Sequence, residues 1–353
     1  MNLAVMPQNR SHRQNDRLRG KIVVVTGASA GVGRAVARRF ARAGASIALM
    51  ARDPDSLDEA REEIERAGGR VITVPTDMAD ADAVFAAAAR VEEELGPIDI
   101  WINNAMATVF SRVADMEPEE FRRVTEVTYL GFVYGTMAAL SHMKTRDRGL
   151  ILQVGSALAY RGIPLQAAYC GAKHAIRGFN DALRTELLHD GSNIRVTMVQ
   201  LPAVNTPQFD WARTHVDHDP RPVAPVFQPE AIAEAVFNAA IGNAPEYWLG
   251  VSTVKAILAS MAFPAVVDRY LAKKGIEAQQ TRSAVSANRR NNLFSAVHGL
   301  HRTRGSFGKN AASSVAMWSG NDIRAAAIGT LATVAAIAAA GILFQATVRR
   351  RLR

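Results

Sequence analysis

The chain has 353 residues, 48% of them apolar and 21% charged, which is enough to bury a full core. Its formal net charge is +9, but 14 of its 42 Lys and Arg residues lie from Arg269 onward, leaving residues 1–268 near neutral. Because the basic character belongs to the tail, we expect no nucleic-acid partner. Cys170 is the only cysteine, which excludes an intrachain disulfide and favours a reducing compartment such as the cytoplasm.

Residues 1–20 carry basic side chains with no apolar run behind them, so we expect a flexible, solvated arm and no signal peptide. Over residues 21–255, short β-branched runs alternate with segments of helical periodicity, two of them at 54–67 and 80–95. This pattern predicts an α/β fold, a Rossmann-type doubly wound parallel sheet of about seven strands. The strands are expected in KIVVVTG, ASIALMA, GRVITVP, PIDIWIN, GLILQVG, NIRVTMVQ and EYWLGV.

The first expected strand ends in TGASAGVG, which places Gly27, Gly31 and Gly33 directly before a helix. Glycines at such a turn let the backbone approach a pyrophosphate, and the free N–H groups of the helix supply an anion site. A glycine-rich turn without a ligand is the alternative reading of this stretch alone.

The stretch YCGAK places Tyr169 and Lys173 four residues apart on a predicted helix, so their side chains share a face. An ammonium group nearby favours the phenolate, so Lys173 is expected to lower the pKa of Tyr169 and fit it for proton transfer. Ser156 stands thirteen residues upstream, at the end of a predicted strand. It would give a second hydrogen bond to a carbonyl oxygen that gains charge during hydride transfer.

TGASAGVG, the NNA triplet at 103–105, Ser156 and YCGAK together resemble the short-chain dehydrogenase/reductase family over about residues 20–250. The resemblance implies an NADP(H)-dependent oxidoreductase that interconverts a small-molecule carbonyl and an alcohol, usually as a homodimer or homotetramer. It implies a catalytic centre of Ser156, Tyr169 and Lys173, with Thr128 as a further member. The cofactor-binding residues that it implies are Gly27, Ser29, Ala30, Gly31, Val32, Gly33, Arg52, Asp77, Met78, Asn103, Ala105, Tyr169, Lys173, Pro202, Val204 and Thr206.

Cofactor choice is expected to depend on Arg52, at the end of the second predicted strand. An acidic residue there would bind the ribose of NAD, whereas a guanidinium holds the 2′-phosphate of NADP through paired hydrogen bonds. A solvated surface arginine is the alternative. In the family an aspartate after the third strand contacts adenine, which points to Asp77, although a helix cap explains the same residue.

Three positions depart from the family pattern. Met106 replaces the glycine of an NNAG motif, Ala203 replaces the glycine of a PGxVxT loop, and Thr128 stands where an asparagine usually anchors a water. We expect altered packing beside the nicotinamide and a proton relay rebuilt through another water. No His, Cys or Asp cluster has metal-ligand spacing, so no metal is expected, and Cys170 is expected to be a packed small residue.

The stretch ALAYRGIPLQ, at 157–166, and the later residues Phe209, Trp211 and Phe227 would line the substrate side of the cleft. Their apolar character predicts an alcohol or carbonyl on a hydrophobic skeleton, although core packing explains the same residues.

Residues 256–323 are expected to form a C-terminal extension, in which the polar and basic stretch 279–319 is an extended or partly disordered linker. Residues 324–353 are expected to form an apolar helix with a basic end. Its uncharged run of 24 residues, Ala325–Val348, could cross a bilayer at roughly 1.5 Å per residue against about 30 Å of hydrocarbon. An Ala-rich helix packed on the protein is the alternative.

A spanning helix would send RRRLR outward, against the positive-inside tendency. A helix lying on the inner face of a membrane, with its arginines on anionic headgroups, avoids this conflict.

Two other functions fit parts of the pattern. A catalytically weak NADP(H)-binding sensor or scaffold tethered to a membrane would keep the nucleotide site despite the three departures. An epimerase or dehydratase of the extended branch also carries YxxxK, but its glycine loop is typically GxxGxxG.

Overall fold

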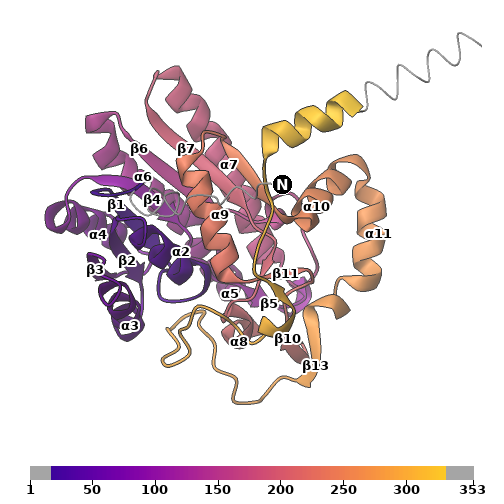
Figure 1. Cartoon of the computed structure of the whole chain (residues 1–353). Coiled ribbons are helices and arrows are strands. Elements are labelled where there is room, and N and C mark those ends of the chain that lie inside the picture. Colours follow the sequence, from indigo (N-terminus) through magenta and orange to yellow (C-terminus); the bar gives the residue numbers. More distant parts are fainter. Residues whose placement is uncertain (1–16, 331–353) are drawn as a thin grey trace, which may run out of the picture.

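The structure is a computed structural model in which residues 17–330 are described (Figure 1). Its central sheet has eight strands in the order β15-β12-β7-β6-β4-β1-β2-β3. The seven predicted strands are all present and run parallel, which confirms the predicted Rossmann-type fold. They are β1 (Ile22–Thr26), β2 (Ser46–Ala51), β3 (Val71–Pro75), β4 (Ile98–Asn103), β6 (Gly149–Val154), β7 (Ile194–Gln200) and β12 (Glu246–Leu249).

The strand order reverses between β1 and β4. After β1 the chain builds outward through β2 and β3, and it then returns to the other side of β1 with β4. In open parallel sheets a ligand crevice lies at this switch point, outside the carboxyl ends of the strands. The glycine loop follows β1 and the NNA triplet follows β4, so both stand at that crevice.

Helices cover both faces of the sheet, as the apolar strands require. Along β1, Val23 and Val25 face one core and Ile22 and Val24 face the other. The first core is covered by α2 (Gly31–Ala41), α3 (Pro54–Glu65) and α9 (Pro229–Ile241). The second is covered by α4 (Ala81–Glu94), α6 (Gly131–Met143) and α7 (Ala167–His189). The helices α3 and α4 confirm the two predicted amphipathic segments.

Shorter elements lie beyond the carboxyl edge of the sheet. Helix α5 (Pro118–Thr125) leads into the single π-helical turn η2 (Glu126–Leu130). Three small sheets pair β5 (Val109–Phe110) with β9 (Arg213–Thr214), β10 (His218–Pro220) with β13 (Gln280–Ala284), and β11 (Val226–Phe227) with β8 (Ala203–Val204) and β14 (Ala311–Ala312). Further helices are α8 (Gln208–Trp211), α10 (Gly250–Ala262) and α11 (Pro264–Lys274).

The stretch 279–319 differs from the extended or disordered linker that the sequence predicts. Its end supplies the eighth strand of the central sheet, β15 (Met317–Ser319), which runs antiparallel to β12. Residues 291–305, which we call the strap, have little regular structure, yet Leu293 is fully buried and Val297 nearly so. Figure 1 shows this segment looping past α8 before the chain turns back toward β15. The boundary predicted at residue 255 falls inside α10.

The predicted apolar helix falls largely outside the described residues, as does most of the predicted N-terminal arm. Residues 320–330 are helical, and the rest of the uncharged run is not described. Within residues 17–330 the structure holds no helix whose length and apolar character would let it cross a bilayer.

Candidate active site

A cavity of about 500 Å³ lies at the switch point of the sheet. It extends from the glycine loop, past Ser156 and α7, to α10 and α11. Of the residues predicted from the sequence, it is lined by Gly27, Ser29, Ala30, Gly31, Val32, Arg52, Asp77, Met78, Ala105, Ser156, Tyr169, Lys173, Pro202, Val204 and Thr206. Gly33, Asn103 and Thr128 do not line it.

The glycine loop forms a cradle that larger residues would fill. Gly27 and Gly31 have φ of +66° and +57°, a region that favours glycine. A Cβ at Gly27 would lie 2.8 Å from the Cα of Ala105, and one at Gly33 would lie 2.1 Å from the carbonyl oxygen of Gly27. Gly33 therefore permits close packing beneath the turn and does not face the cavity. A backbone turn of this kind, ending at the start of α2, fits the pyrophosphate of a dinucleotide.

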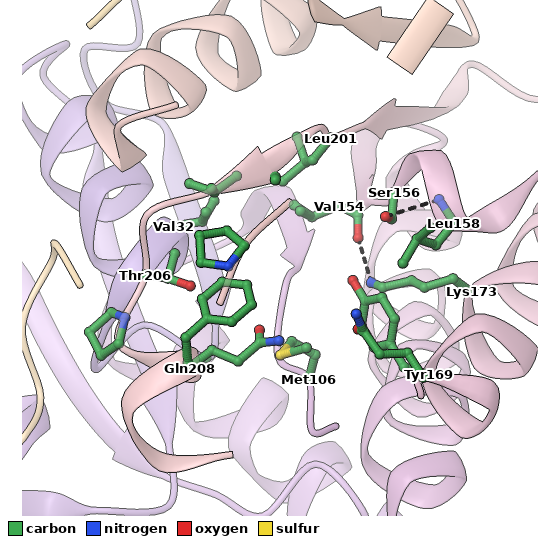
Figure 2. Close-up of a pocket in the computed structure, with 18 of the residues that line it drawn as sticks. Val32, Met106, Val154, Ser156, Leu158, Tyr169, Lys173, Leu201, Thr206 and Gln208 are labelled. Carbon is green, nitrogen blue, oxygen red and sulfur yellow. Dashed lines mark hydrogen bonds between the residues drawn. The ribbon is translucent and has the colours of Figure 1, made fainter. Parts of the chain in front are cut away.

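Ser156, Tyr169 and Lys173 gather on one side of the cavity, as Figure 2 shows. Ser156 directly follows β6, and its N–H donates to Oε1 of Gln200 at 2.8 Å, which fixes the serine backbone. Its Oγ accepts from the N–H of Leu158 at 3.1 Å. Tyr169 and Lys173 come from the first turns of α7, so one rigid helix sets their spacing.

Lys173 is 2% exposed, and its Nζ donates to the carbonyl oxygen of Val154 at 2.8 Å. The Nζ also lies 4.5 Å from the ring centre of Phe132 and 5.6 Å from that of Tyr169. Burial lowers the pKa of Lys173 to about 7. The ammonium is therefore close to its midpoint at neutral pH.

The prediction that Lys173 lowers the pKa of Tyr169 is wrong for this structure. Burial of the phenol raises the pKa of Tyr169, and the hydrogen bond with Ser156 acts in the opposite direction without outweighing it. The physical reason is that burial dominates, while the Nζ of Lys173 donates to the carbonyl oxygen of Val154 and lies 5.6 Å from the ring centre of Tyr169. Burial also raises the pKa of Cys170, to about 11, which agrees with a packed and inert thiol.

Thr128 lies in the π-helical turn η2 and is fully buried. Its Oγ1 accepts from the N–H of Ala107 and donates to the carbonyl oxygen of Ala107, each at 2.9 Å. The hydroxyl both accepts from and donates to Ala107, so Thr128 clamps the loop after β4 and does not face the cavity.

Asn103 is likewise buried behind the cavity. Its amide nitrogen donates to Gln153 at 3.0 Å and to Thr136 at 3.1 Å, and its oxygen accepts from Nε1 of Trp101 at 2.8 Å. The residue that lines the cavity is Asn104. No signal in the sequence separates Asn103 from Asn104, because a strand that is buried on both faces shows no alternation of apolar and polar residues.

The strap contacts the cavity wall at Arg52. The guanidinium of Arg52 donates to the carbonyl oxygens of Leu293 at 3.3 Å and Phe294 at 3.2 Å, and also to that of Asn292. Leu293 also accepts from Nε of Arg123 at 3.1 Å, and Arg123 pairs with Asp77 at 2.5 Å. The alternative reading of Arg52 as a solvated surface arginine is therefore wrong. Burial lowers the pKa of Arg52.

The strap also contacts the glycine loop. The carbonyl oxygen of Arg302 accepts from the N–H of Gly31 at 3.0 Å, and that of His301 accepts from Arg34 at 3.1 Å. Four strap residues line the cavity wall, which the sequence did not predict: Asn292, Ala296, Val297 and His301. The strap thus covers the nucleotide end of the cavity without filling it.

Asp53, which lines the cavity, also contacts the strap. His298 Nδ1 lies 2.9 Å from Oδ1 of Asp53, and the candidate ligand atoms of Asp53, Asp55 and His298 all lie within 4.8 Å of one another. His298 lies more than 240 positions along the chain from Asp53 and Asp55, so the absence of metal-ligand spacing in the sequence says nothing about this cluster. The close contact of His298 with Asp53 accounts for this cluster as a point where the strap meets the body of the protein.

The substrate end of the cavity is largely apolar. Leu158, Ile163, Phe209 and Trp211 line it as predicted. Phe227 does not, because it belongs to β11 and packs into the core against α9. The sequence missed the contribution of α10 and α11, whose lining residues are Ser252, Thr253, Ala256, Tyr270, Leu271 and Lys274.

The family profile described as short chain dehydrogenase matches residues 21–216 of the chain. The uncharacterized oxidoreductase YxnA of Bacillus subtilis is 31% identical over 288 residues, which cover 81% of each protein. A 3-dehydrosphinganine reductase of Danio rerio is 34% identical over 236 residues, covering 64% of this chain and 70% of that enzyme.

Two solved structures share the fold. An alcohol dehydrogenase from the archaeon Thermococcus sibiricus, complexed with 5-hydroxy-NADP, is 29% identical with a TM-score of 0.56 and covers 65% of this chain and 95% of that one. A metagenomic short-chain oxidoreductase in complex with NADP is 27% identical with a TM-score of 0.55, covering 65% and 96%.

Proposed function

The chain belongs to the short-chain dehydrogenase family of oxidoreductases, and we propose from this that it interconverts a carbonyl and an alcohol with NADP(H). The observation that carries the proposal is that Ser156, Tyr169 and Lys173 line one cavity with the glycine cradle. The hydroxyl of Ser156 and the phenol of Tyr169 therefore lie in the cavity that would also hold the dinucleotide. This arrangement suits proton transfer to an oxygen that gains charge.

When bound, the nicotinamide supplies or accepts the hydride. In the reducing direction Tyr169 gives a proton from its hydroxyl to the carbonyl oxygen, and Ser156 donates a second hydrogen bond to that oxygen. The raised pKa of Tyr169 keeps the phenol protonated and so ready to donate. Lys173 exchanges protons readily near neutral pH because its pKa is about 7. In the oxidising direction the same groups act in reverse.

We assign NADP(H) over NAD(H) because of Arg52. The strap contacts it with main-chain carbonyl oxygens, which are neutral, so its positive charge is still present beside the cavity. A 2′-phosphate is the group of the cofactor that this charge would favour. The NADP and 5-hydroxy-NADP of the two solved relatives support the same choice.

The substrate we propose is a hydrophobic alcohol or carbonyl compound. The support is the apolar lining at the substrate end, to which Leu158, Ile163 and Phe209 contribute. The name of the Danio rerio relative, 3-dehydrosphinganine reductase, describes a reductase acting on a carbonyl compound and agrees with the reducing direction.

A screen of purified full-length protein tests the proposal. Oxidation of NADPH and of NADH is followed side by side against ketones and aldehydes of increasing chain length. We expect turnover with NADPH, rising with the apolar size of the substrate. No turnover with any carbonyl or alcohol would contradict an oxidoreductase of this kind, and a strict preference for small charged carbonyls would contradict the substrate class.

A second candidate is a catalytically weak NADP(H)-binding sensor or scaffold. The observation that favours it is that Thr128, which the family resemblance places in the catalytic centre, is fully buried and does not line the cavity. Tight NADPH binding by calorimetry, with no turnover in the screen, would identify the sensor. We further propose a homodimer or homotetramer in the cytoplasm, with residues 324–353 in contact with the inner face of a membrane.

A further inference from the structure

Helices α10 and α11, residues 250–274, form a hairpin that exposes large apolar side chains. Helix α11 buries none of its residues. Met261, Phe263, Val266 and Tyr270 are 61%, 64%, 60% and 65% exposed. Single exposed apolar residues are ordinary, but a run of them on one hairpin marks a surface that meets another apolar phase.

The hairpin also borders the substrate end of the cavity. Tyr270, Leu271 and Lys274 of α11 line the cavity, and so do residues of α10. Tyr270 belongs both to the exposed apolar set and to the cavity wall. The apolar surface is therefore continuous with the mouth through which a hydrophobic compound would pass.

The charges of the hairpin are almost all positive. Its basic residues are exposed and are Lys255, Arg269, Lys273 and Lys274. Its single acidic residue, Asp268, is paired with Arg161. An apolar face rimmed by unopposed cations suits a surface of anionic headgroups over acyl chains.

The uncharged run that begins at Ala325 starts at the same end of the molecule. Arg324 binds the carboxylate of Glu246 and donates to the hydroxyl of Tyr160 at 2.7 Å. Tyr160 directly follows the short helix η4 (Ala157–Ala159), which packs against α10. Figure 1 shows the helix after β15 leaving the body of the protein beside α10.

We propose that the α10–α11 hairpin docks on an anionic phospholipid bilayer, with Phe263 and its apolar neighbours among the acyl chains. A second copy of the chain is the less suitable occupant, because two copies would bring their basic rims together. The cavity mouth then faces the lipid. That an apolar substrate enters from the bilayer is a further step, which rests on the proposed function.

A tryptophan placed on the hairpin reports docking directly. Full-length Phe263→Trp protein is mixed with phosphatidylcholine vesicles, with or without phosphatidylglycerol, and its emission is compared with that of the wild type. We expect a blue shift and quenching by brominated acyl chains with the anionic vesicles. The matched variant Leu188→Trp, on α7 at a position that is 74% exposed, should show neither.

Two results would overturn the proposal. One is a Phe263→Trp emission that anionic vesicles leave unchanged, even if the protein sediments with them through another segment. The other is a blue shift that grows with protein concentration in the absence of lipid, which would identify a second copy as the occupant. Neither result depends on catalysis, so a failure of docking is distinguishable from a failure of the proposed function.

The double variant Phe263→Ser/Val266→Ser tests the substrate step. Neither residue lines the cavity, so kcat and KM for a short soluble ketone should match those of the wild type. For a long-chain ketone held in anionic vesicles, we expect KM to rise about tenfold. An unchanged KM for the vesicle-borne ketone would contradict entry from the bilayer.

Discussion

The carbonyl oxygen of Arg302 accepts a hydrogen bond from the N–H of Gly31 at 3.0 Å, although 271 positions separate the two residues. Through this contact the strap reaches the loop that would cradle a pyrophosphate. Its other end holds Arg52, where a 2′-phosphate would bind. The nucleotide end of the cavity is therefore built from both ends of the described chain.

The most deeply buried apolar residue of the strap is Leu293, which is fully buried and packs in one cluster with Val124, Val127 and Ala168. Leu293→Ala should cost about 2–5 kcal/mol of packing free energy, most of it as local opening of the strap. We expect trypsin to cut faster at Arg289 and Arg290, as followed by mass spectrometry. Leu188→Ala, at an exposed position, is the control. Equal cleavage in the two variants would show that Leu293 does not hold the strap.

Arg52 should decide cofactor preference. Arg52→Ala removes the guanidinium that would pair with a 2′-phosphate, so the Kd for NADPH should rise about tenfold or more, or about 1.4 kcal/mol. The Kd for NADH should change little. Calorimetric titration with both nucleotides measures this, with the exposed Arg66→Ala as the control. Equal losses for both nucleotides would assign Arg52 to the strap alone.

Lys173 should make stability depend on pH. Its folded pKa of about 7 lies below the unfolded value of 10.5. Between these values the unfolded chain binds the extra proton, so the free energy of unfolding should rise with pH from about 7 upward. Urea unfolding of wild type and Lys173→Met at pH 6.5, 8 and 9.5 checks this. The stability of the variant relative to the wild type should be greatest at pH 6.5 and should decline as the pH rises. A difference that is constant with pH would show that Lys173 is not perturbed by burial.

Thr128→Val tests the clamp on the loop after β4. Valine has nearly the same shape but leaves the N–H and the carbonyl oxygen of Ala107 without the hydroxyl that they share. We expect a loss of about 1–3 kcal/mol in the free energy of unfolding. Thr185→Val, at an exposed position on α7, should change stability by about 0.5 kcal/mol or less. Similar losses in the two variants would contradict the clamp.

The fold could be predicted because each central strand is a short apolar run and each covering helix has a charged and an apolar face. The same local signals placed Gly27 and Ser156 at one edge of the sheet, since residues that follow parallel strands share that edge. The spacing of Tyr169 and Lys173 placed them on one face of a helix. The side-chain partners of the predicted residues were not predictable. Thr128 and Asn103 turn away from the cavity to satisfy buried polar groups, and such pairings depend on atoms distant in the chain.

The structure of the C-terminal extension could not be predicted from its amino-acid composition. Residues 279–319 are polar and basic, which is typical of a linker, yet they are held by hydrogen bonds from Arg52, Arg34 and Gly31 to main-chain carbonyl oxygens. Every residue has a main-chain carbonyl oxygen, so these hydrogen bonds require no particular residue type and cannot be predicted from the sequence. The strand β15 was missed for a related reason, since three residues at a sheet edge carry too little pattern.

The proton donor is the central claim, and Tyr169→Phe tests it most directly. The variant keeps the ring but loses the hydroxyl, and its control is Tyr134→Phe, a residue that does not line the cavity. With NADPH and the best ketone of the screen, kcat should fall by about 10²–10⁴-fold in Tyr169→Phe and stay unchanged in the control. The Kd for NADPH should remain within a few-fold of the wild type in both. A Tyr169→Phe enzyme that still binds NADPH and reduces the ketone at the wild-type rate would contradict the assignment of Tyr169 as the proton donor.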